Sequence, residues 1–406
     1  MIDATHDPAL TSWVESANSA ETDFPIQNLP YATFRSPKTA GARLGVAIGE
    51  QVLDVSSAFD IPSMLTVIAM PREARTALRR RISQFLTTRS ESAEQWLLPM
   101  DEVELLLPCE VPDYTDFYAS IHHATNVGSM FRPDNPLLPN YKWLPVAYHG
   151  RASSVVVSGT QVRRPRGQIV SNPAGPPQYA ASRLLDYEVE LGAFLGPGNP
   201  MGEPIPIAEA EDHLFGVCLL NDWSARDIQT WEYQPLGPFL AKSFATSVSP
   251  WVVTLDALEP FRRATPARPP GDPDPLPHLQ TAGDSAFGIT LEVWLRSARM
   301  RQPMLISRGD FSQMYWTLAQ MVAHHSSNGC PLRAGDLIGS GTVSGPEKQN
   351  RGCLLEMTWR GAEPVELPTG ETRKFLEDGD EVILRGWCES PGFRRIGLGE
   401  CRGTIR

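Results

Sequence analysis

The abundance of proline is the feature that most limits how this chain can fold. The 406 residues include 37 prolines, about 9% of the chain where about 5% is usual in globular proteins. Each proline fixes φ and lacks the backbone N–H that helix interiors and central strands require. This composition therefore favours short strands joined by ordered loops over a bundle of helices. We expect a mainly β fold of the α+β class.

The length of the chain predicts two unequal domains, because single cores seldom grow beyond about 250–300 residues. Residues 43–54 read as a β-hairpin that turns at residues 49–51. Between about residues 63 and 98 the apolar pattern becomes helical, with one face formed by Leu78, Ile82, Phe85 and Leu86. We assign residues 1–112 to a small N-terminal domain and residues 113–406 to a larger catalytic domain.

The remainder of the chain reads mostly as strands, with two exceptions. Seven prolines between residues 260 and 277 predict a surface loop. A helical stripe of mostly apolar residues runs from Phe311 to His325, and Asp310 with Gln313 resembles a capping box. We therefore expect a helix that begins near residue 310.

Charge and composition exclude several classes of partner. The net charge of −11 argues against nucleic acid, because phosphate binding depends on Lys and Arg, although a local pocket can still bind an anion. No apolar run approaches the ~18 residues that span a bilayer, and no signal peptide is visible. The six scattered cysteines form no CxxC pair, which is typical of free thiols in a reducing cytosol. We expect a cytoplasmic protein with no membrane partner.

Four carboxylates in apolar or aromatic segments suggest a cation site. Alternation along a strand would place Asp186, Glu188 and Glu190 on one face. Neighbouring carboxylates on one face repel each other unless water or a cation intervenes. A solvated strand face is the alternative, but the apolar surroundings favour a cation. Together with Asp116 and Asp222, Glu188 and Glu190 would form an all-oxygen ligand set, which selects Mg²⁺ or Ca²⁺ rather than zinc. Spacing alone does not show that these residues converge.

Other polar residues have less specific patterns. Arg226 and Gln229 would point the same way on a helical turn. Lys242 lies in an apolar stretch, where a surface lysine that extends to solvent is the commoner case, but near carboxylates it could stabilise a developing anion. Among the histidines, bare sequence does not rank His123 above His149 as a catalytic base.

Seven segments match one known family in a single order. They are residues 24–31, 113–118, 123–128, 148–154, 221–229, 231–239 and 341–345. The chain therefore resembles the fumarylacetoacetase family over nearly its whole length. The resemblance implies an N-terminal SH3-like β-barrel and a C-terminal mixed β-roll that builds the active site and a homodimer.

The resemblance also implies a reaction. The substrate would be a small dicarboxylic β-diketo acid, 4-fumarylacetoacetate, whose C–C bond is hydrolysed in a metal-dependent step to fumarate and acetoacetate. This is the last step of tyrosine and phenylalanine catabolism. Alternatives are an acylpyruvate-type hydrolase on the same fold and a catalytically inactive, metal-binding structural homologue. The complete 123–128 and 148–154 segments count against the first, and His123, Glu356 and Lys242 together count against the second.

The family's functional residues can be carried over to matching positions. In this resemblance His123 activates water and pairs with Glu356. Charge on the reacting substrate is stabilised by Arg226, Gln229 and Lys242. The substrate is held by Tyr118, Arg132, Tyr148, Gln229, Tyr233 and Thr342. The metal ligands are Asp116, Glu188, Glu190 and Asp222, with Lys242 and Thr246 near the ion.

One position departs from the family pattern. The family usually has glycine where this chain has Ala245, in the segment Lys242-Ser-Phe-Ala-Thr246. If that glycine has a positive φ or lets the backbone approach a ligand, Ala245 should be strained, because glycine alone meets either demand without cost.

Overall fold

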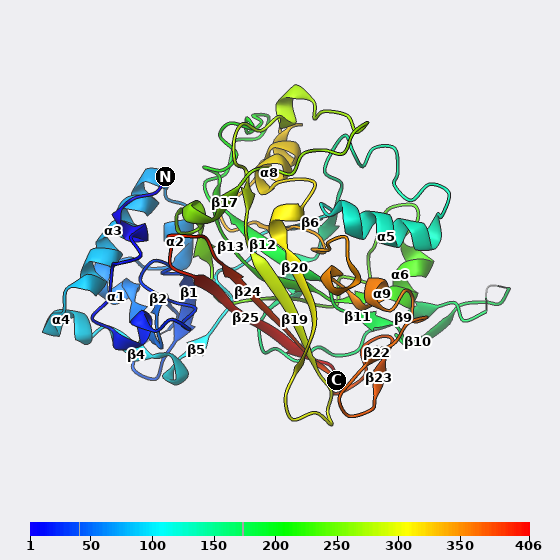
Figure 1. The fold of residues 1–406 in the computed structure, drawn as a ribbon, viewed down its shortest axis with the longest axis horizontal. Coiled ribbons are helices and arrows are strands. Elements are labelled where there is room, and N and C mark those ends of the chain that lie inside the picture. The colour runs from blue at the N-terminus through cyan, green and yellow to red at the C-terminus, as the bar shows by residue number, and fades with distance from the viewer. Residues whose placement is uncertain (40, 173) are drawn as a thin grey trace.

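The N-terminal region is built on a five-stranded antiparallel sheet (Figure 1). The structure is a computed structural model that describes residues 1–39, 41–172 and 174–406. The sheet has the order β4-β3-β2-β1-β5. Its strands are β1 Tyr31–Arg35, β2 Arg43–Ile48, β3 Gln51–Asp54, β4 Leu97–Pro99 and β5 Glu104–Leu105.

The predicted hairpin is confirmed by the pairing of β2 with β3. Its turn contains Gly49, whose φ is +56°, a conformation that L-residues with side chains rarely adopt. A Cβ at this position would also lie 2.3 Å from the Ser16 hydroxyl. Glycine is therefore required here both by backbone conformation and by close packing.

The helical region after the hairpin consists of four helices. They are α1 Val55–Phe59, α2 Met64–Ile68, α3 Arg72–Thr87 and α4 Glu91–Glu94. Pro71 separates α2 from α3, because proline fits the start of a helix but not its interior. On α3, Leu78, Ile82 and Leu86 are buried and Phe85 is half-buried, as the periodicity predicted.

The C-terminal region contains an eight-stranded sheet and a four-stranded sheet. The first has the order β7-β6-β21-β12-β13-β15-β8, with β16 paired to β13. Its strands are β6 Tyr114–Phe117, β7 Ala147–Gly150, β8 Val155–Val157, β12 Val189–Leu195, β13 Leu214–Asp222, β15 Thr246–Val248, β16 Val253–Thr254 and β21 Leu337–Gly339. The second has the order β20-β19-β24-β25. Its strands are β19 Thr290–Arg296, β20 Met304–Asp310, β24 Glu381–Cys388 and β25 Ile396–Thr404.

Short elements connect these sheets. The remaining helices are α5 Ile121–Phe131, α6 Arg226–Glu232, α7 Leu255–Leu258, α8 Leu318–Ser326 and α9 Leu354–Met357. The remaining strands are β9 Arg166–Ile169, β10 Gln178–Ala181, β11 Leu185–Asp186, β14 Ser224–Ala225, β17 Arg262–Arg263, β18 Ala286–Phe287, β22 Val365–Glu366 and β23 Thr372–Arg373. The expected mainly β, α+β class is confirmed.

Strand β13 is buried along its whole length because it contributes to two cores. Val217 and Leu219 pack in the larger core, which includes residues of β19 and β24. Cys218 and Leu220 point to the opposite face, as alternation requires, and pack in a second core with residues of the N-terminal sheet and α3. Tyr31 of β1 also exchanges two backbone hydrogen bonds with Val252, at 2.9 and 2.8 Å. The boundary at residue 112 stays a prediction.

The predicted helix start near residue 310 is wrong. Asp310 caps only a single 3₁₀ turn, Phe311–Gln313, after which Met314 is extended. Helix α8 begins later, at a capping box in which Thr317 and Gln320 each accept a backbone N–H from the other. Between the two, Trp316 is fully buried. The extended backbone at Met314 and Thr317 interrupts the helix, and helix periodicity alone did not reveal it.

Two expectations about loops have opposite outcomes. The proline-rich segment 260–277 is irregular apart from the short strand β17 and the ends of two 3₁₀ turns, as predicted. At Ala245 a positive φ, the first of the two conditions for strain, is not met, because this residue is not among the described non-glycine residues with positive φ. Those residues are Leu29, Asp60, Trp359 and Arg360.

Two further properties bear on the environment of the protein. In the part of the chain that the structure describes, no helix is both long and apolar enough to cross a membrane. Each of the six cysteines is a free thiol, as the scattered spacing predicted.

Candidate active site

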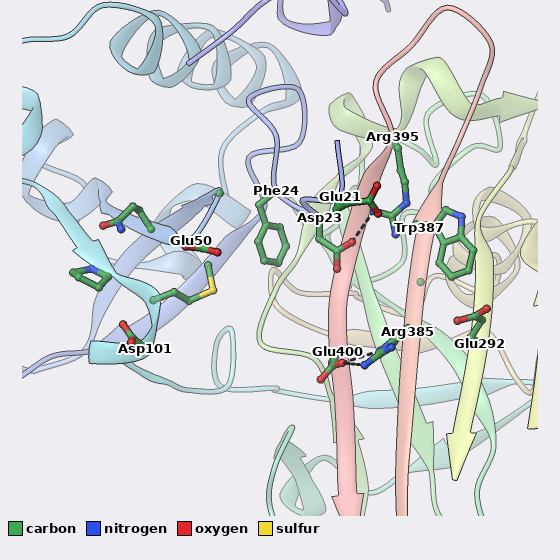
Figure 2. A pocket seen from close by; sticks show the side chains of 15 residues that line it. Glu21, Asp23, Phe24, Glu50, Asp101, Glu292, Arg385, Trp387, Arg395 and Glu400 are labelled. Carbon is green, nitrogen blue, oxygen red and sulfur yellow. Dashed lines mark hydrogen bonds and ion pairs between the residues drawn. The ribbon is translucent and has the colours of Figure 1, made fainter. Parts of the chain in front are cut away.

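Two cavities differ in size and in chemistry. The larger, about 880 Å³, lies between the N-terminal sheet and strands β24 and β25 (Figure 2). Its arginines are paired, Arg385 with Glu400 and Arg395 with Asp23, and none of the predicted site residues lines it. The other, about 480 Å³, is lined by all the predicted site residues except Asp222, Thr246 and Glu356. Chemistry rather than volume identifies the second cavity as the candidate site.

Three carboxylates converge at this cavity, two of them in its lining and the third, Asp222, beside them. Asp116 comes from β6, Glu190 from β12 and Asp222 from the end of β13, and these three strands lie in the run β6-β21-β12-β13 of one sheet. Ligand oxygens of the three side chains all lie within 4.8 Å of one another. Gly339 of β21 permits this approach, since a Cβ there would lie 2.5 Å from Asp116 Oδ1.

The electrostatics of this cluster fit a hard cation. Burial raises the pKa of Asp116 well above its usual value, and the Asp222 carboxylate adds to the effect. Burial raises the pKa of Glu190 in the same way, together with repulsion from Asp116. Asp116 Oδ1 and Glu190 Oε1 are buried without a hydrogen-bond partner. Buried, mutually repelling oxygens without partners suit coordination to Mg²⁺ or Ca²⁺.

Glu188, the fourth predicted ligand, lies beside this cluster rather than within it. Its carboxylate pairs with Lys242 and with Arg226 Nη1, the latter at 2.8 Å. Burial raises the pKa of Glu188, but Lys242 and Arg226 outweigh burial and lower it to about 2. Lys242 also donates to Asp222 Oδ2 at 2.7 Å, so one ammonium joins Glu188 to the three-carboxylate cluster.

Lys242 is not the solvent-reaching lysine of the alternative interpretation. Its side chain is buried, with 6% exposed. Burial lowers the pKa of Lys242, but Asp222 and Glu188 outweigh it and raise the pKa above its usual value. The cavity therefore contains a fixed positive charge beside the carboxylates.

The strand that was expected to carry Asp186, Glu188 and Glu190 on one face is interrupted, but Glu188 and Glu190 both line the cavity and Arg226 contacts both Asp186 and Glu188. Regular pairing stops between β11, which ends at Asp186, and β12, which begins at Val189. At the interruption the Glu188 backbone N–H donates to Asn221 Oδ1 at 3.1 Å. Tyr187, Val189 and Leu191 all pack in the larger core, so the two sets of side chains still alternate in direction across the interruption.

His123 lies in the first turn of α5, where Ser120 caps the helix by accepting the His123 N–H. Its Nδ1 is 2.5 Å from Glu356 Oε2. Burial raises the pKa of Glu356, but His123 and the hydrogen bonds from Asn126 and Ser344 outweigh burial and lower it to about 2. An ionised carboxylate can only accept, so His123 Nδ1 carries the proton.

The other ring nitrogen of His123 faces the cavity. His123 Nε2 lies 3.9 Å from Glu188 Oε1, and with Nδ1 protonated it is the basic nitrogen. His149, in contrast, is exposed on β7 and lines a separate cleft with His324 and His325. The structure brings His123, and not His149, to the cavity.

The predicted substrate-binding side chains approach from several elements. Tyr148 donates to Asp222 Oδ2 at 2.7 Å, and the Tyr118 ring packs edge-on against His123 with centroids 5.1 Å apart. Arg132 ends α5, and its Nε is buried without a partner. The Thr342 hydroxyl is likewise buried and unpartnered, and Tyr233 ends α6 at the cavity wall.

The remaining predicted residues lie close to these groups. Arg226 opens α6, and its Nη1 donates to Gln229 Oε1 at 3.2 Å, one turn later, as the i, i+3 spacing predicted. Thr246 is buried behind the cavity and donates to Asp222 Oδ1 at 3.3 Å.

Several residues of the site were not found from the sequence. Asn126, Ser344 and Cys353 each donate to the Glu356 carboxylate, at 2.8, 2.8 and 3.2 Å. Asn126 follows His123 by three residues on a helix, which was a usable signal. Ser344 and Cys353 carry no such signal, because the fold brings them together across separate segments. Arg360 at the cavity wall was also missed.

Comparison with known proteins agrees with this geometry. Residues 27–108 match the family model described as fumarylacetoacetase N-terminal, and residues 114–406 match fumarylacetoacetate hydrolase C-terminal. Curated relatives include fumarylacetoacetases of Bos taurus, 48% identical, and Homo sapiens, 49% identical, each covering 95% of this chain and 96% of the relative. The fumarylacetoacetase of Arabidopsis thaliana is 46% identical over the same shares.

Solved structures show the same fold at low sequence identity. A fumarylacetoacetate hydrolase from Exiguobacterium antarcticum has a TM-score of 0.54 and is 18% identical, covering 93% of this chain and 99% of that one. A maleylpyruvate hydrolase from Sphingobium has a TM-score of 0.51 and is 16% identical, with the same coverage. The full-length relatives and both family models lead to one conclusion: the chain belongs to the fumarylacetoacetase family.

Proposed function

We propose that this chain hydrolyses the C–C bond of 4-fumarylacetoacetate to fumarate and acetoacetate, the last step of tyrosine and phenylalanine catabolism. The observation that carries the proposal is that a histidine base and a buried three-carboxylate cluster open into one cavity. The match in name and length to curated fumarylacetoacetases supports this substrate. The chain is thus a hydrolase that acts on a carbon–carbon bond.

A divalent cation, Mg²⁺ or Ca²⁺, is the cofactor that the oxygen-rich ligand set fits. Asp116, Glu190 and Asp222 would hold it, with Glu188 as the fourth ligand once its carboxylate turns from Lys242 and Arg226. Lys242 and Thr246 would lie beside the ion. When bound, such a cation polarises a carbonyl oxygen of the β-diketone.

The base is His123. Its Nε2 takes a proton from the water that attacks the carbonyl, while Glu356 accepts from Nδ1 and stabilises the imidazolium that forms. Breaking the C–C bond then releases the electron pair to the neighbouring carbon as an enolate. Arg226, Gln229 and Lys242 stabilise the negative charge, and the proton returns from His123 to that carbon. Atoms and charges balance as one water added across one C–C bond.

The substrate carboxylates need fixed partners in a protein whose net charge of −11 repels them. Arg132 would hold one of them through two-point guanidinium geometry. The hydroxyls of Tyr118, Tyr148 and Tyr233 and the free hydroxyl of Thr342 would orient the rest of the substrate, with Gln229.

A homodimer is the proposed assembly. Large apolar side chains are exposed beside the cavity, including Leu236 at 95%, Phe239 at 66% and Trp231 at 48%. Such exposure is typical of surfaces that another chain covers. Sedimentation velocity should give the mass of two chains, and Phe239→Asp should shift it toward one. A monomer at micromolar wild-type concentration would contradict the assembly.

The deciding experiment is hydrolysis of authentic fumarylacetoacetate, followed by its absorbance with product analysis. We expect equal amounts of fumarate and acetoacetate, loss of turnover with a chelator, and recovery with Mg²⁺ or Ca²⁺. An acylpyruvate serves as the comparison substrate and should react more slowly. Absence of turnover with either cation, or faster cleavage of the acylpyruvate, would overturn the proposal.

A further inference from the structure

We propose that Asp186 is a positioning residue that holds the charge-stabilising arginine and the segment carrying Glu356 at one common point. The inference rests on the proposed function, because it assigns Asp186 a role in that same reaction. Asp186 is fully buried and does not belong to the three-carboxylate cluster. Its two oxygens instead contact groups on two separate helices.

The first contact is with Arg226 at the start of α6. Arg226 donates from Nε to Asp186 Oδ2 at 2.9 Å, and its Nη2 lies 2.9 Å from the same oxygen. The remaining guanidinium nitrogen, Nη1, is left to face Glu188 at 2.8 Å and Gln229 at 3.2 Å. Because Asp186 holds Nε and Nη2, Nη1 is the nitrogen that faces the cavity.

The second contact is with the first turn of α9. The backbone N–H groups of Leu354 and Leu355 donate to Asp186 Oδ1 and Oδ2, at 2.8 and 2.9 Å. Helix α9 has only four residues and no side-chain cap of its own. Asp186 therefore supplies from a distant segment the acceptor that would otherwise be a capping side chain. Glu356 is the third residue of this helix.

The strand that carries Asp186 keeps the carboxylate in place. Asp186 lies opposite Ser224 in the β11–β14 pair, and α6 follows β14 directly. Leu185, the preceding residue, accepts the Leu376 N–H at 2.8 Å. The contact with Arg226 and the contact with α9 therefore both depend on one short, paired strand. A shift of Asp186 would move Arg226 and Glu356 together.

This arrangement matters because the reaction needs a base and a charge-stabilising group at fixed relative positions. The base His123 takes its orientation from Glu356, and Glu356 belongs to the helix that Asp186 fixes. A displacement of about 1 Å in such groups can lower a rate about 10²-fold. Asp186 does not line the cavity, so it would act through the two residues it holds.

The test compares Asp186→Asn with a matched control, Asp380→Asn. Asp380 is also fully buried and bonds an arginine, accepting from Arg373 Nε at 2.8 Å and Nη2 at 3.0 Å, but Arg373, unlike Arg226, does not line the cavity. Both substitutions weaken a buried carboxylate–guanidinium pair. We expect kcat for fumarylacetoacetate to fall about 10²-fold in Asp186→Asn, with a smaller change in KM, and to stay near wild type in Asp380→Asn.

Two double-mutant cycles separate positioning from general stability. If Asp186 acts through Arg226 and Glu356, Asp186→Asn should cost little further kcat in an Arg226→Lys background or in a Glu356→Gln background. Urea unfolding of every variant ensures that kcat refers to folded protein. Should Asp186→Asn not fold, Asp186→Ser carries the same comparisons.

The outcomes are distinct. The inference would be overturned if an Asp186 variant retained wild-type kcat or lost no more kcat than Asp380→Asn. It would also be overturned if the Asp186 substitution lowered kcat by the same factor in both mutant backgrounds as in the wild type. Wild-type chain that fails to cleave fumarylacetoacetate would instead overturn the proposed function. The wild-type assay is measured first, so the two failures cannot be confused.

Discussion

At the scale of single residues, the His123–Glu356 contact has the most direct consequence for activity. We expect His123→Ala to lower kcat by about 10²–10⁴-fold, the span usual for general acid–base catalysis, while binding of Ca²⁺ measured by calorimetry persists. Glu356→Gln should also lower kcat without loss of the cation. The double variant should be little worse than His123→Ala, because the two side chains act as one unit. Full activity in His123→Ala would exclude this base.

Arg132 carries the second prediction at this scale. Its Nε is buried and unpartnered. Its Nη2 donates one hydrogen bond to the Pro136 carbonyl at 3.1 Å. Arg132→Lys should raise KM more than it lowers kcat, since lysine keeps the charge and loses two-point geometry. The exposed Arg299→Lys is the control and should leave both constants unchanged. Equal KM values for the two variants would show that Arg132 does not hold the substrate.

The sequence predicted which residues form the site better than it predicted which residues contact them. Asp116, Glu190 and Asp222 stood out as carboxylates in apolar segments, and the structure groups them. Ser344 and Cys353 could not be found, because their contact with Glu356 depends on how distant loops meet. Glu188 shows the same limit, since its pairing with Lys242 is decided by three-dimensional packing.

At the scale of elements, helix α8 provides a test of where the helix begins. Its capping box uses Thr317 and Gln320, whereas Asp310 caps only a 3₁₀ turn. Thr317→Ala should lower the free energy of unfolding by about 1 kcal/mol, the usual cost of losing a helix N-cap. Asp310→Ala should cost less, as measured by urea unfolding. The reverse order would place the functional start of the helix at residue 310.

Local patterns predicted elements well where the chain is regular and poorly where it is not. The β2–β3 hairpin and the buried face of α3 followed from periodicity of two and of 3.6. The start of α8 did not, because the apolar stripe continues across Met314 and Thr317, where the backbone is extended. The break between β11 and β12 was missed for the same kind of reason, since backbone N–H groups of α9 and Arg226 hold Asp186.

At the scale of the whole molecule, the carboxylate cluster links stability to pH and to the cation. Burial and then mutual repulsion raise the pKa of Asp116 and Glu190 above 3.8 and 4.5. Folding therefore favours their protonated forms, and that stabilisation is complete below these ordinary values and is lost as pH rises through the raised ones. Chelated protein should lose stability from about pH 4.5 upward, the ordinary range of free carboxyl groups.

Urea unfolding across this pH range, with chelator or with Ca²⁺, measures the effect. Saturating Ca²⁺ should restore stability at neutral pH, because it binds the folded form. Glu190→Gln should flatten the pH dependence of the chelated protein and abolish the response to Ca²⁺. An unchanged profile in Glu190→Gln would mean that the cluster does not carry this energy.

The core that β13 shares with the N-terminal sheet has a consequence for how the chain is made. Tyr31 leaves the ribosome roughly 220 residues before Val252, its hydrogen-bond partner, a delay on the order of 10–40 s at ordinary rates of translation. Cys218 and Leu220, which complete the same core, are also synthesised late. During that interval the nascent N-terminal sheet presents an uncovered apolar face, the kind of surface that chaperones recognise.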